Sequence, residues 1–324
     1  MKRTKGNIAM TMLLATMMLL AAGFMFSACS SDEPAPPRVS EKSELRFEIN
    51  SQQFTRANVI SDDGDLQDQD LRIDAYYNGT ATAYISNAQL VYAGGSWRFD
   101  DGSGTEVHYY WPIEGSIETT NDITVGSLDF VGYMPYVQPP YISDMSYSAS
   151  GPSITCDMSS YMTSSAQSGI TELMCAFVTN QTKDTNSGTV NMSFKHPFAC
   201  IRFQLSAASG SDVQANTITI SNLYTRGACS FDGSTSTWSD WSGTANLVVS
   251  GDPATGDTPY LVIPNNYGAM TLTVNATWSG FGSATKDVST DIDINWLPGY
   301  SYTYTLTLKK DGLIVDVNKY TEQW

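Results

Sequence analysis

Few residues of this chain have the types and spacing that chemistry requires, and the first candidates are Glu106 and His108. Positions i and i+2 of a strand share one face, so these two side chains could bind a metal ion together. The sequence places no third ligand nearby, and we interpret the pair as exposed polar residues. The other histidine, His196, precedes Pro197 and is more typical of a strand start than of a catalytic base.

An acid-rich loop is the second candidate, because carboxylates can hold calcium. Gly64 comes too early for an EF-hand and no glutamate closes the loop, so we interpret the loop as a solvated turn. The loop aspartates are Asp62, Asp63, Asp65, Asp68 and Asp70.

Sequence motifs for a nucleophile elbow, a phosphate-binding loop or a zinc-binding H-E-x-x-H helix do not occur. The scattered carboxylates select no glycosidase pair. We therefore predict a non-enzyme without cofactor or metal.

Cysteine and tryptophan residues each allow two interpretations. Trp238 and Trp241 could stack on sugars, although such residues more often cap a core in a β-sandwich. Four cysteines could form two disulfides in an oxidising compartment or remain four buried thiols. Their spacing fits no zinc-ligand pattern. These cysteines are Cys156, Cys175, Cys200 and Cys229.

The first segment is typical of a secretory signal that ends at a lipidated cysteine. A basic start precedes an apolar run, which stops at Cys29 after small residues and is followed by polar residues. A plain transmembrane anchor is the alternative. We predict a signal peptide over 1–28, lipid on Cys29 and a Pro-rich, extended tether over 29–42. The lipid would hold the chain in the outer membrane, on the cell surface.

Composition excludes one class of partner. Of the 324 residues, 33 are acidic and 17 basic, for a net charge of −16. Without residues 1–28 the balance is 14 basic against 33 acidic residues. Such a charge repels nucleic acid and anionic membrane surfaces.

The elements that would position any functional residues are predicted to be β-strands. Residues 44–50 alternate strictly, with Leu45, Phe47 and Ile49 on one face, which predicts a half-buried strand. Further strand and turn signals recur every 8–12 residues or so, and no sustained helical period occurs. Residues 137–170 are rich in Ser and Pro, which predicts a loop. We expect an all-β chain with sandwich domains over 43–184 and 185–324.

Several motifs in order make the chain resemble the fimbrillin family of type V pilus subunits. The motifs are Tyr110-Trp111-Pro112, Leu128-Asp129-Phe130-Val131-Gly132-Tyr133-Met134-Pro135, Phe194-Lys195-His196-Pro197-Phe198, Tyr260-Leu261-Val262-Ile263-Pro264 and Trp296-Leu297-Pro298-Gly299-Tyr300. The resemblance implies two transthyretin-like β-sandwich domains in tandem. It also implies that an Arg-specific protease removes the first strand and that the C-terminal strand of a neighbouring subunit fills the vacated groove.

The sequence supplies candidates for each part of that scheme. Leu45, Phe47 and Ile49 would form the resident strand. Cleavage after Arg56 would leave Ala57 as the mature N-terminus, whereas Arg46 lies inside the strand and cleavage at Arg38 would leave the strand attached. Leu313, Val315 and Val317 repeat the i, i+2, i+4 spacing and would form the donor strand. The alternative is that 313–317 is the last strand of its own domain.

The function predicted from these observations is a structural pilus subunit that supports adhesion, with other fimbrial subunits as partners. The alternative is a non-polymerising surface lipoprotein that binds a glycan or a host protein.

Overall fold

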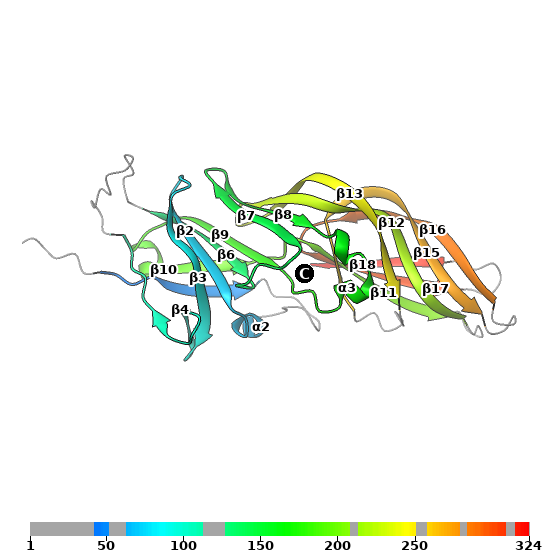
Figure 1. Cartoon of the computed structure of the whole chain (residues 1–324), viewed down its shortest axis with the longest axis horizontal. Helices are drawn as coiled ribbons and strands as arrows, with labels where there is room; N and C mark the ends of the chain where they lie inside the picture. The colour runs from blue at the N-terminus through cyan, green and yellow to red at the C-terminus, as the bar shows by residue number, and fades with distance from the viewer. Residues whose placement is uncertain are drawn as a thin grey trace, which may run out of the picture. The chain divides into compact units, whose positions relative to one another are not determined.

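Strands dominate the protein, as Figure 1 shows for the computed structural model. The structure describes residues 42–51, 63–112, 127–207, 213–250, 258–278, 284–308 and 315–323. Within these ranges the helical elements are α2 (Asp63–Gln67), α3 (Ser164–Gln167) and the 3-10 turns η1 (Ser159–Tyr161) and η2 (Thr185–Gly188). The predicted all-β fold class is therefore confirmed. No helix in the described ranges is long and apolar enough to span a membrane.

The first sheet has six antiparallel strands in the order β5-β4-β3-β2-β6-β9. Alternating apolar residues of these strands are buried in one cluster, which fits the strand signals of the sequence. The strands are β2 (Leu71–Tyr77), β3 (Ala83–Ala93), β4 (Ser96–Asp100), β5 (Glu106–Val107), β6 (Leu128–Met134) and β9 (Met174–Gln181).

A parallel pair, β1 (Arg46–Ser51) and β10 (Thr189–Phe194), buries its apolar residues in the same cluster as the first sheet. Its two strands come from distant parts of the sequence, and their register places Phe47 opposite Val190 and Ile49 opposite Met192. The pair and the sheet thus form the two layers of a sandwich.

Strand β6 is buried on both faces. Leu128 and Phe130 lie in the cluster of the first sheet, whereas Val131 and Tyr133 lie in a second cluster. Gly132 allows β10 to approach, because a Cβ there would lie 2.6 Å from Cζ of Phe194. This strand therefore connects the two hydrophobic clusters.

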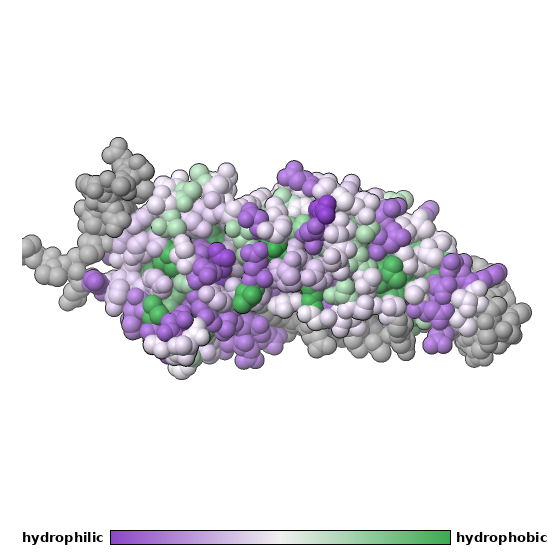
Figure 2. Space-filling model, viewed as in Figure 1, coloured by the Kyte–Doolittle hydropathy of each residue, from purple (hydrophilic) through white to green (hydrophobic). Residues whose placement is uncertain are grey.

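The second cluster lies between two further sheets. One has the order β16-β15-β12-β8-β7, with β13 also paired to β12, and the other has the order β14-β11-β17-β18. The strands of the first of these are β7 (Ile142–Ser148), β8 (Gly151–Asp157), β12 (Val213–Phe231), β13 (Ser236–Ser250), β15 (Asn265–Trp278) and β16 (Ala284–Trp296). Those of the second are β11 (Ala199–Ala207), β14 (Tyr260–Val262), β17 (Tyr300–Leu308) and β18 (Val315–Gln323). On the face seen in Figure 2, apolar residues are scattered among hydrophilic ones.

The prediction of a loop over 137–170 is wrong, because this segment contains β7 and β8. In β8 the buried residues Pro152, Ile154 and Cys156 alternate with Ser and Thr, and the strand pairs with β12. Strands from both sides of the expected boundary at 184/185 enter both clusters, since β10 packs in the first and β8 in the second. The two-domain division stays a prediction.

Candidate functional site

Strand β1 has one apolar face, which is buried. The buried side chains are only 5%, 8% and 5% exposed for Leu45, Phe47 and Ile49, respectively. Their neighbours Arg46 and Glu48, which point to the other face, are exposed. The predicted half-buried strand over 44–50 is therefore confirmed. Arg46 lies within this strand, whose backbone is paired with β10.

Phe47 is the centre of the packing under β1. Its ring meets Phe99 of β4 edge-on at 5.3 Å between centroids, and Phe130 of β6 edge-on at 5.7 Å. Edge-to-face contacts of this kind add to the stabilisation from burial alone. On β10, Val190 and Met192 are fully buried beside the strand. One aromatic side chain of β1 therefore touches the opposite sheet at two strands.

The segment before β1 is fixed by a different neighbour. The backbone N–H of Leu45 donates to the carbonyl of Tyr109 at 2.9 Å, and that of Trp111 donates to the carbonyl of Ser43 at 2.7 Å. Residues 43–45 thus run antiparallel to residues 109–111, with a bridge between Glu44 and Tyr110. The N-terminal end of the candidate resident strand is held by the segment that follows β5.

A groove with a volume of about 700 Å³ runs along β1. Over the described residues, β1 has a hydrogen-bonded ladder only with β10. Residues of β1, β4 and β5 line the groove, among them Phe47, Trp97 and Val107. The strand can therefore be approached from solvent along its length.

The C-terminal strand β18 lies in a different sheet from β1. It pairs antiparallel with β17 and is the last strand in the order β14-β11-β17-β18, with Val317 opposite Leu306 and Val315 opposite Leu308. Leu313 lies outside the described residues. The structure thus places residues 315–317 of the predicted donor segment in an edge strand of their own sheet, and a donor role requires β18 to leave β17.

The predicted lipidation residue Cys29 and the predicted processing residues Arg56 and Ala57 also lie outside the described residues, as does Arg38. The described segments end at Ser51 before Arg56 and resume at Asp63 after it.

The four other cysteines are buried free thiols, not disulfides. Burial raises the pKa of Cys156, Cys200 and Cys229 to about 12. Burial also raises the pKa of Cys175 well above its usual value. Thiols of such high pKa are protonated at neutral pH and behave as small apolar side chains.

The two tryptophans considered for sugar stacking differ. Trp238 is buried against Phe198 and donates its indole N–H to the carbonyl of Pro197 at 2.6 Å. Trp241 is 38% exposed and donates to the carbonyl of Pro264 at 3.2 Å. Trp238 therefore belongs to the core.

The two histidines also differ. His196 is buried, where its Nδ1 hydrogen-bonds Glu172. His108 is half-exposed, and its Nδ1 donates to a carboxylate oxygen of Glu44. This hydrogen bond raises the pKa of His108 above its usual value.

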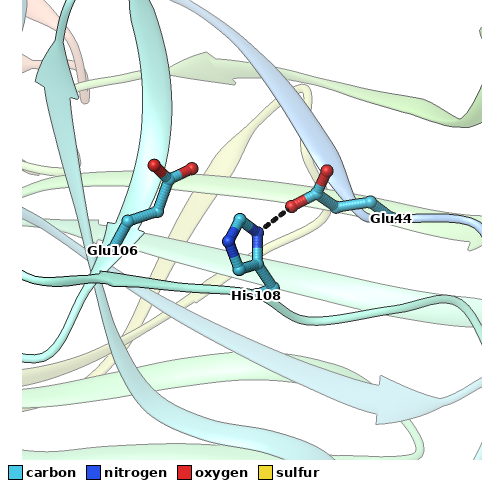
Figure 3. A group of neighbouring side chains, drawn as sticks. All are labelled: Glu44, Glu106 and His108. Carbon is cyan, nitrogen blue, oxygen red and sulfur yellow. Dashed lines mark hydrogen bonds and ion pairs between the residues drawn. The ribbon is translucent and has the colours of Figure 1, made fainter.

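Glu44, Glu106 and His108 form a cluster of which the sequence spacing predicts only the last two members. Each offers one ligand atom, and these atoms all lie within 4.8 Å of one another. Figure 3 shows the imidazole between the two carboxyl groups, with Glu44 arriving from the segment before β1. Glu106 also lies near Arg98, at 3.6 Å between Oε2 and Nη1. The sequence supplied the i, i+2 pair but gave no sign that Glu44 lies beside it.

A family model described as fimbrillin-like matches residues 55–324, a range that excludes β1. No curated protein matches the chain.

Solved structures that resemble the chain include a fimbrial protein from Bacteroides vulgatus, with a TM-score of 0.55, 15% identity and coverage of 87% of this chain and 99% of that one. A protein from Bacteroides uniformis assigned to cell adhesion has a TM-score of 0.53 and 21% identity, over 90% and 100% of the two chains. One from Bacteroides ovatus, also assigned to cell adhesion, has a TM-score of 0.55 and 16% identity, over 87% and 98%.

Proposed function

Since the chain belongs to the fimbrillin-like family, we propose that it is a structural subunit of a cell-surface fimbrium that assembles by exchange of a β-strand after proteolysis. The observation that carries this proposal is β1. It is a short strand near the N-terminus whose apolar face is buried and whose backbone ladder involves β10 alone among the described strands. Such a strand can be removed without breaking the order of any larger sheet.

Removal of β1 creates a site that demands a replacement. The backbone of β10 and the buried side chains of Val190, Met192 and Phe194 would lose the strand paired with them. Unpaired backbone groups and an apolar groove are both costly in water. Burying three apolar side chains of a new strand is worth roughly 5–9 kcal/mol as an upper estimate. This free energy can drive association between subunits.

The C-terminal strand is the donor in this proposal. An edge strand has one ladder to break, so β18 can leave β17 at a lower cost than a central strand. Its residues 315–317 continue the alternating pattern that begins at Leu313. Strand β18 is paired with β17 of its own chain, which is also expected for the alternative. That alternative is a surface lipoprotein that does not polymerise and binds a glycan or host protein. Assembly of the cleaved subunit distinguishes the two.

Lipid attachment gives a first prediction. Replacing Cys29 with alanine removes the acceptor thiol at the end of the apolar run, so the variant is expected to incorporate no labelled fatty acid and to leave the membrane fraction. Wild-type protein labelled in parallel is the control. A Cys29→Ala variant that still carries the label contradicts attachment at this residue.

Processing after Arg56 gives a second prediction and tests the proposed function. Subunits recovered from fibres are expected to begin at Ala57 by Edman sequencing, and an Arg56→Ala variant is expected to stay uncut and unpolymerised. Arg46→Ala is the matched control, since Arg46 lies within the paired strand β1 and is expected to leave processing unchanged. Stalk subunits that retain Cys29 in fibres contradict the proposal. An anchor subunit would keep its lipid.

A further inference from the structure

We propose that Glu44, Glu106 and His108 bind one divalent transition-metal ion of the zinc class, and that this ion fastens the N-terminal end of β1 to β5. The cluster is the one place among the described residues where three candidate ligand atoms converge. Its part in strand retention rests on the proposed function, whereas metal binding itself does not.

The backbone brings the three ligands together. Glu106 belongs to β5, and His108 follows two residues later, so their side chains can share one face. Glu44 is held beside them because residues 43–45 pair with residues 109–111 through two backbone hydrogen bonds. Two hydrogen-bonded segments thus supply one site, although residues 44 and 106 are 62 positions apart in sequence.

The ligand types select the metal. An imidazole nitrogen with two carboxylate oxygens suits zinc and similar ions, whereas calcium and magnesium prefer oxygen alone. Zinc–ligand bonds of about 2.0–2.2 Å place tetrahedral ligand atoms roughly 3.3–3.6 Å apart. The present ligand atoms lie within 4.8 Å of one another, so small side-chain rotations suffice. All three side chains are exposed enough for an ion to enter, at 36%, 44% and 50% for Glu44, Glu106 and His108.

Metal binding replaces an existing contact without opening the core. The Nδ1 proton of His108, now donated to Glu44, is released to solvent if that nitrogen becomes the ligand. Two carboxylates lie beside one imidazole here, and Arg98 lies beside Glu106, at 3.6 Å between Nη1 and Oε2. A divalent cation therefore neutralises negative charge at this point. The protein supplies three ligands, and water can take a fourth position.

The consequence for β1 follows from its position. Glu44 lies just before the strand. An ion held jointly by Glu44 and His108 would exchange their hydrogen bond for metal–ligand bonds between the resident strand and a different chain segment. Loss of the ion would leave the hydrogen bond between His108 and Glu44, together with the two backbone hydrogen bonds between residues 43–45 and 109–111, as the attachment of that end. The site thus controls how readily β1 leaves after cleavage.

Zinc titration of the uncleaved chain, followed by calorimetry, tests binding. One zinc ion per chain is expected to bind, and the affinity is expected to fall at least about tenfold in His108→Gln and in Glu44→Gln. Glu48→Gln is the matched control, because Glu48 is exposed on the same strand but outside the cluster. X-ray absorption spectroscopy at the zinc edge should find an imidazole nitrogen and oxygen atoms as ligands, and no sulfur. Unchanged affinity in His108→Gln, equal loss in Glu48→Gln, or a sulfur ligand overturns the site.

Hydrogen exchange tests the fastening. Zinc is expected to slow exchange of the Leu45 amide, which donates to Tyr109, in wild type but not in His108→Gln. Equal exchange with and without zinc overturns the role in holding β1 even where zinc binds. Polymerisation of cleaved subunits in a chelator tests the proposed function separately, since strand exchange does not require the ion. The two ideas can therefore fail independently.

Discussion

Replacing Phe47 with alanine is expected to lower the free energy of unfolding of the uncleaved chain by about 3–5 kcal/mol. The side chain is buried, and its ring contacts both Phe99 and Phe130 edge-on. Alanine would leave a cavity between β1 and the opposite sheet, which close-packed neighbours fill only partly. Chemical denaturation of both proteins measures the difference.

Glu48→Ala is the control for this experiment. Glu48 is the next residue of the same strand and is exposed, so its replacement is expected to change the free energy of unfolding by no more than about 0.5 kcal/mol. A Phe47→Ala protein as stable as the Glu48→Ala protein contradicts the packing described for β1. Such a result would also mean that burial of this face of β1 stabilises the protein little, so that its loss would not favour a replacement strand.

Replacing Val315 with aspartate is expected to block fibre growth. If residues 313–317 enter a neighbour's groove, the new carboxylate is buried without a partner. That costs several kcal/mol, and about 1.4 kcal/mol is a factor of ten, so polymer yield should fall at least tenfold. Sedimentation after limited Arg-specific proteolysis measures the yield. The uncleaved monomer is expected to remain folded, because β18 is an edge strand and β1 still occupies its own place.

Asp316→Asn is the matched control for Val315→Asp, since it changes the alternate position of the same strand. It is expected to polymerise like wild type. Equal polymer yield from Val315→Asp and wild type would eliminate this strand as the donor. Unfolding of the Val315→Asp monomer would instead assign β18 to the core of its own sheet, the arrangement in which it pairs with β17, and would favour the non-polymerising alternative.

The sequence predicted those strands whose pattern is strong. Residues 44–50 alternate between large apolar and charged side chains, and β1 was found there. By contrast, β7 and β8 were mistaken for a loop because Ser, Thr, Gly and Pro fill their alternate positions. Strand β8 pairs with β12, whose partner residues lie about 70 positions later in the sequence, and β7 pairs with β8.

The candidate site shows the same limit. The spacing of Glu106 and His108 was visible in the sequence, but Glu44 reaches them only through the pairing of residues 43–45 with residues 109–111. A long-range backbone pairing of this kind leaves no local signal. Likewise, the apolar pattern at 313–317 predicted a strand without specifying its partner, which is β17 for residues 315–317.

An electron cryo-microscopy map of fibres grown from the cleaved subunit would show which strand lies beside β10 in the assembled fibre. If strands are exchanged, the place of β1 beside β10 is expected to hold the C-terminal strand of a neighbouring subunit, including Val315 and Val317. The alternating side chains identify the strand in the map. A map in which Phe47 of the same chain still lies beside Val190, with β18 paired to its own β17, would contradict strand exchange.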